Sequence, residues 1–148
     1  MAFFGKRRQT PPQRTFDITM AMVQAAMAED AQALTSLSQR LEPIDVFADL
    51  ADFYANVTPR LTPEQKEMIR REIDAVDGPP AVKTAVHDIG LPLFLELDPQ
   101  AVATQITLHG KASVNGPGNL WADITMETIF VASRINQALD ITMNWSSR

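Results

Sequence analysis

The chain has 148 residues, of which 45% are hydrophobic and 21% are charged. This composition is typical of an ordinary globular protein of about one domain, and it excludes a wholly disordered chain. There is no cysteine, which excludes disulfides, iron–sulfur ligation and a cysteine nucleophile and is compatible with the cytoplasm. No apolar run reaches the roughly eighteen residues of a membrane span, and no secretory signal is recognisable at the start.

The net charge of −5 is unevenly distributed along the chain. Residues 1–14 contain no acidic residue and four basic ones, which are Lys6, Arg7, Arg8 and Arg14. Because this segment carries +4, the remaining residues carry −9, which disfavours binding to nucleic acid. Prolines at 11 and 12 interrupt regular structure. We therefore expect a disordered basic arm over residues 1–14 and a single helical domain over residues 15–148.

Apolar residues at steps of three and four predict two helices after the arm. The first begins near Thr15 and carries the stripe Phe16, Met20, Val23 and Met27. A break at Glu29 and Asp30 would let a second helix run from Ala31 to Leu41, and one continuous helix is the alternative.

The next two predicted helices carry clear end signals. Pro43 suits the first turn of a helix over Ile44–Val57, whose Asp45, Asp49 and Asp52 form a row that we expect to be solvated. Thr62, Pro63 and Gln65 form a capping-box pattern for the following helix, which carries a narrow apolar stripe and is expected on the outside of the fold. Residues 77–80 stop that helix.

Residues 81–128 leave alternatives open. We expect a short helix closed by Gly90, a turn over residues 90–92, and then a very apolar helix or extended segment to Leu97. Asp98 and Pro99 predict the start of another helix. Alternation at residues 106–109 and 124–127 would instead suit a small β-hairpin near residues 103–128.

The longest predicted helix is Asn119–Asp140, and we expect the other segments to pack around it. Its apolar positions recur with a 3.6-residue period and cover more than one face; they include Trp121, Ile124, Val131 and Ile135. The 3.6 period favours helices over the hairpin. The expected fold is mainly α, a compact multi-helix bundle of about six to seven helices.

No pattern of catalytic, metal-binding or cofactor-binding residues is recognisable. The doublet His87–Asp88 occurs in metal-dependent phosphohydrolases of the HD type, but no histidine precedes His87 here. His109 is the other histidine, so a zinc site would need carboxylates to complete it. No nucleophile–base pair or phosphate-binding loop is present either. We therefore expect a protein that is not an enzyme and has no cofactor.

The predicted function is a non-catalytic helical protein–protein interaction or assembly protein in the cytoplasm, either a homo-oligomer such as a homodimer or a subunit of a larger assembly with another protein. The reason is the nearly all-round apolar character of helices 44–57 and 119–140, which something must cover. The alternative is a binding module that encloses a small apolar ligand between its helices. The candidate interaction or pocket residues are Met20, Met22, Met27, Phe47, Leu93 and Trp121.

Overall fold

The computed structural model describes residues 12–114 and 120–141, with side chains for residues 15–111 and 120–141. Within these residues there are seven α-helices and no strand. They are α1 (Pro12–Met27), α2 (Ala31–Ser38), α3 (Pro43–Val57), α4 (Pro63–Asp74), α5 (Pro80–Gly90), α6 (Pro99–Val114) and α7 (Leu120–Ala138). A 3-10 turn, η1 (Thr58–Arg60), follows α3, and a π-helical segment, η2 (Leu91–Glu96), continues α5. The mainly α fold is therefore confirmed.

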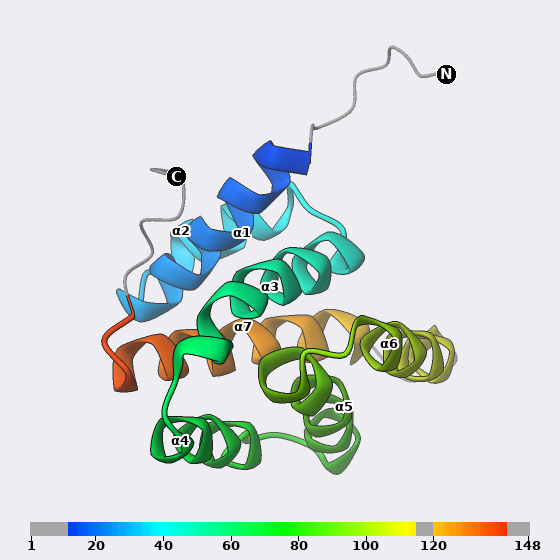
Figure 1. Ribbon diagram of the computed structural model, residues 1–148. Helices are drawn as coiled ribbons and strands as arrows, with labels where there is room; N and C mark the ends of the chain where they lie inside the picture. The colour runs from blue at the N-terminus through cyan, green and yellow to red at the C-terminus, as the bar shows by residue number, and fades with distance from the viewer. Residues whose placement is uncertain (1–11, 115–119, 142–148) are drawn as a thin grey trace.

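Helix α7 is the central element, as its apolar pattern predicts. It packs against α1, α3, α4, α5 and α6. In Figure 1 it runs across the middle of the molecule, with α1–α3 on one side and α4 and α5 on the other. Of its predicted apolar face, Ile124, Val131 and Ile135 are buried and Trp121 is partly buried.

A buried tyrosine connects α3 to this central helix. The hydroxyl of Tyr54 donates a hydrogen bond of 2.6 Å to Asn136 Oδ1, and it lies 3.3 Å from the carbonyl oxygen of Ala132. Its ring packs edge-on against Phe94 of η2, with centroids 4.8 Å apart. Burial raises the pKa of Tyr54 far above its ordinary value, so the hydroxyl stays protonated and remains a donor.

Several helices begin directly after a residue whose side chain caps the helix N-terminus. The Thr62 hydroxyl accepts from the backbone N–H of Gln65 at 3.1 Å, and the Gln65 side chain accepts from the N–H of Thr62 at 2.9 Å, which is the predicted capping box of α4. The Asp98 carboxylate accepts from the N–H of Ala101 at 3.1 Å and begins α6 as expected.

The predicted break after the first helix is also confirmed. Asp30 caps α2 by accepting from the N–H of Ala33, and Glu29 has a positive φ of 57° that ends α1. Helix α1 begins at Pro12, three residues before the predicted start, and α2 ends at Ser38 rather than Leu41. Residues 1–11 of the predicted arm lie outside the described residues.

The expected turn after the fifth helix is wrong. No turn occurs at residues 90–92, because Gly90 has ordinary helical angles (φ −66°, ψ −40°) and α5 continues into η2. Pro92 has no N–H to donate, and its ring would clash with the carbonyl group four residues earlier in a regular α-helix; a wider π turn relieves that clash. The helix instead ends at Leu97, whose φ is 54°.

The alternative hairpin across residues 103–128 is not supported. Residues 103–114 belong to α6 and residues 120–128 to α7, and both are helical throughout. The alternation at 106–109 and 124–127 is the result of short apolar runs that suit two periods equally well, and the longer 3.6-residue period decides the structure. No helix among the described residues is long and apolar enough to cross a membrane.

Candidate interaction groove

A shallow apolar groove lies between α3 and α6, with a volume of about 250 Å³. We call it the α3/α6 groove. Its walls are apolar apart from one carboxylate, and its lining residues are Ile44, Phe47, Ala48, Ala51, Asp52, Pro99, Val102, Ala103 and Ile106. Prolines at the first positions of α3 and α6 fix where the two helices begin. Three alanines leave the space between the helices unfilled.

The floor of the groove is aromatic. Phe47 is fully buried, and its ring centroid lies 5.4 Å from that of Trp121 at an angle of 41°. Trp121 in turn lies against Gly110 of α6, where a β-carbon added to the glycine would lie 3.9 Å from the indole ring. The groove is therefore lined by α3 and α6, and Trp121 of α7 supports Phe47 from beneath.

The rim of the groove carries an exposed isoleucine. Ile44 is 55% exposed, and among the described residues only Leu108, at 57%, is a comparably exposed large hydrophobic residue. Ile44 therefore places an aliphatic side chain in contact with water at the edge of an apolar depression.

The charge around the groove is negative. Asp52 lines it and is exposed, and Asp45 lies about two turns earlier on the same helix. The sequence of α3 contains no lysine or arginine, and neither do residues 99–110 of α6. A partner that placed a basic residue beside Asp52 would therefore meet no repulsion from these two helices.

The predicted candidate residues divide between this groove and the core. Phe47 forms the groove floor and Trp121 packs beneath it. Met20, Met22 and Leu93 are buried in the hydrophobic core, at 6%, 1% and 1% exposure, and Met27 is partly buried against it. The candidate set therefore does not converge on one surface, and the exposed apolar lining residues Ile44, Ala48 and Ala103 were not in it.

The expectation of a solvated acidic row on α3 is wrong for Asp49. Asp49 is only 7% exposed, because α1 packs on this side of α3, and it accepts a hydrogen bond of 2.8 Å from the Thr19 hydroxyl. Burial raises the pKa of Asp49 from 3.8 to about 6, the hydrogen bond from Thr19 opposes this, and the charges of Asp45 and Asp52 add to it. The side chain of Thr15 also hydrogen-bonds to Asp49.

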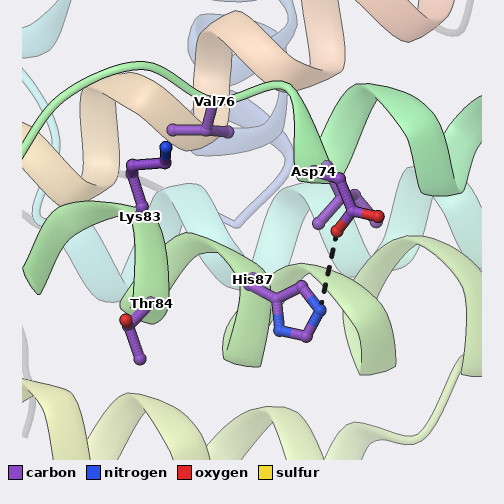
Figure 2. Close-up of a pocket in the computed structure, with 6 residues that line it drawn as sticks. Asp74, Val76, Lys83, Thr84 and His87 are labelled. Carbon is purple, nitrogen blue, oxygen red and sulfur yellow. Dashed lines mark ion pairs between the residues drawn. The ribbon is translucent and has the colours of Figure 1, made fainter. Parts of the chain in front are cut away.

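A second pocket lies where α4 ends and α5 begins (Figure 2). Its volume is also about 250 Å³, and it is lined by Ile73, Asp74, Val76, Lys83, Thr84 and His87. His87 Nε2 lies 3.6 Å from Asp74 Oδ1, and the imidazole is 46% exposed. The ionisable groups of this pocket are the Lys83 amine, the His87 imidazole and the Asp74 carboxylate. They lie on an open surface and do not suggest a particular catalytic reaction or ligand.

The two histidines join three helices through carboxylates. His87 Nδ1 lies 3.5 Å from Asp88 Oδ1, and His109 Nε2 of α6 lies 3.0 Å from Asp88 Oδ2. Although Asp88 stands between two histidines, the described residues contain no group of three ligands that could hold a metal ion. Only the contact between His109 and Asp88 has hydrogen-bond geometry, and it connects α6 to α5, whereas the contacts of His87 with Asp74 and Asp88 are longer ion-pair distances.

Comparison with protein-family models, with curated proteins and with solved structures found no match. The described residues therefore form a mainly helical structure with an apolar groove that has one carboxylate, Asp52, in its lining.

Proposed function

We propose that this protein is a non-catalytic interaction protein that self-associates through the α3/α6 groove. The observation that carries the proposal is the exposed Ile44 at the edge of an apolar depression lined by Ala48, Ala51 and Ala103. In a dimer with twofold symmetry the same surface meets itself, so a projecting side chain beside a depression is self-complementary. Each copy would place Ile44 against the alanines of the other.

The chemistry of the groove supports binding rather than catalysis. Its one ionisable lining residue is Asp52, which is exposed and has no general base or nucleophile beside it in the groove. Apolar walls over an aromatic floor are instead suited to burying a few aliphatic side chains. Burial of the exposed area of Ile44 and its neighbours contributes only a small binding free energy. We therefore expect a dimer that forms at micromolar to high-micromolar concentrations.

Sedimentation equilibrium of the full chain tests the proposal. The wild-type protein is expected to reach the mass of a dimer at high micromolar concentration. Ile44→Glu puts a charge where the partner would bury an aliphatic group, so it is expected to leave a monomer. Leu108→Glu is the matched control, because Leu108 is equally exposed and lies outside the groove lining. Unchanged association of Ile44→Glu, or a wild-type monomer throughout, would contradict the proposal.

A small apolar ligand is the alternative occupant of the same groove. The mostly apolar lining of the groove, with Phe47 at its floor, favours it, since such a lining can contact an apolar molecule. Native mass spectrometry of the purified protein separates the two functions. A doubled mass without added mass supports self-association, whereas a monomer that carries a small molecule supports the ligand.

A further inference from the structure

The depression of the α3/α6 groove lies on one side of the exposed Ile44. Ile44 is the first α3 residue of the lining, Ala48 and Ala51 follow it along the helix, and Ala103 of α6 completes the small-residue wall. If Ile44 of each copy fills the depression of the other, the two α3 helices must therefore run in opposite directions. Parallel α3 helices related by a twofold axis would instead place the two Ile44 side chains at the same level.

The antiparallel arrangement also sets which residues meet. Ala48 is exposed and lies midway between Ile44 and Asp52 on one stripe of α3. At a rise of 1.5 Å per residue, Asp52 lies about 6 Å beyond Ala48 and Asp45 lies about 4.5 Å before it. Asp45 and Asp52 are two helical turns apart and so share one flank of α3. A twofold axis at Ala48 therefore brings Asp52 of one copy beside Asp45 of the other.

No basic residue of the two groove helices offsets these carboxylates. Asp52 is exposed and Asp45 is partly buried. Asp45 Oδ2 accepts from the backbone N–H of Glu42 at 3.3 Å, which holds this carboxylate at the first turn of α3. The sequences of α3 and of residues 99–110 contain no lysine or arginine. Two pairs of like charges, one at each end of the contact, would therefore oppose association of the two copies.

We propose that two copies associate with their α3 helices antiparallel about Ala48, and that the Asp45–Asp52 pairs between the copies make this association stronger as the ionic strength rises. The inference rests on the proposed function and adds the orientation and the regulation of the same contact. An interface held by opposite charges would respond to salt in the opposite direction.

The size of the effect follows from the spacing of the helices. Packed helices have axes about 8–10 Å apart, which is well within the Debye length of about 30 Å at 0.01 M ionic strength. At 1 M the Debye length is about 3 Å, so the same charges are screened from one another. Two like-charge pairs about 8 Å apart near a protein surface then correspond to an association constant about three- to tenfold higher at 1 M than at 0.01 M.

Sedimentation equilibrium of the full chain in sodium chloride at about 0.01 M and about 1 M measures this dependence. The wild-type association constant is expected to show the full rise. Asp52→Asn removes one charge from each pair, so its dimer is expected to be tighter at low salt and nearly independent of salt. Glu64→Gln is the matched control, because Glu64 is exposed on α4 outside the groove lining and its replacement loses the same charge. It should keep the wild-type rise.

Reversal of one charge tests the register itself. Asp52→Lys places an ammonium group beside Asp45 of the other copy, so its dimer is expected to be tighter than wild type at low salt and to weaken as salt rises. A dimer that Ile44→Glu abolishes, but whose association constant does not rise with salt or whose Asp52→Lys variant responds to salt as the wild type does, overturns this inference alone. A monomer under every condition, in wild type and in Asp52→Lys, overturns the proposed function as well.

Discussion

Replacement of the buried Asp49 by asparagine tests whether α1 covers this side of α3. In the folded chain the pKa of Asp49 is about 6, above its ordinary 3.8, because burial disfavours the carboxylate. The folded state therefore binds the proton more tightly than the unfolded state. Stability from this group is present below pH 3.8 and is lost as the pH rises through about 6.

The magnitude follows from the two pKa values. A tenfold difference in proton affinity corresponds to about 1.4 kcal/mol, so ionisation of Asp49 reduces the free energy of unfolding by about 3 kcal/mol at pH 7. In Asp49→Asn this cost disappears, and the amide oxygen can still accept from the Thr19 hydroxyl. A buried amide N–H₂ without a partner costs about 1–2 kcal/mol, so we expect a net stabilisation of about 1–2 kcal/mol at pH 7.

Urea denaturation at pH 4 and pH 7 measures the effect. The difference in unfolding free energy between Asp49→Asn and wild type is expected to become about 2 kcal/mol more favourable to the variant between these pH values. Asp17→Asn, an exposed carboxylate on α1, controls for the loss of one negative charge. A difference that stays constant with pH, or that favours the wild type more at pH 7 than at pH 4, would refute the burial of this carboxylate.

Two further substitutions test the contacts that position the helices. Tyr54→Phe removes the hydroxyl that donates to the buried Asn136 Oδ1, so it is expected to lower the free energy of unfolding by about 1–3 kcal/mol in urea denaturation. A decrease of less than about 0.5 kcal/mol would contradict this hydrogen bond. Thr62→Ala removes one half of the capping box of α4 and is expected to cost about 1 kcal/mol, with Thr104→Ala on the exposed surface of α6 as the control.

Local signals were sufficient to predict most helix positions. Capping residues and first-turn prolines act within one or two helical turns, so Thr62 with Gln65 and Asp98 with Pro99 mark their helix starts without any knowledge of the rest of the fold. The central position of α7 was predictable because a helix with apolar residues on several sides must be covered on several sides.

The candidate site was much harder to predict because it depends on which helices meet. Asp45, Asp49 and Asp52 lie at helical steps of four and three, which predicts the same solvent exposure for all three. Asp49 is buried because α1 packs over it. The groove arises from alanines at 48, 51 and 103, which belong to helices far apart in sequence. The one sequence signal for the groove was the presence of small residues near Ile44. The 3.6-residue period of the apolar residues, however, predicts only an ordinary apolar face for helix 44–57.

The continuation of α5 through Pro92 shows a different limit. Glycine and proline in sequence usually mark a turn, but that rule assumes the regular α-helical geometry. Here a π turn accommodates the proline, and the Thr58 hydroxyl donates to the carbonyl oxygen of Phe94 at 2.8 Å. That contact comes from a residue thirty-six positions earlier, so no local pattern could reveal it.

Paramagnetic broadening between copies tests self-association through the groove most directly. A spin label on Ala55→Cys, exposed on α3 but outside the groove lining, is mixed at high micromolar concentration with ¹⁵N-labelled wild-type protein. A twofold dimer through the groove predicts broadening of amides in α3 and in the first half of α6, with those of α2 and α4 unaffected. No broadening, or broadening centred on α2 or α4, would contradict it.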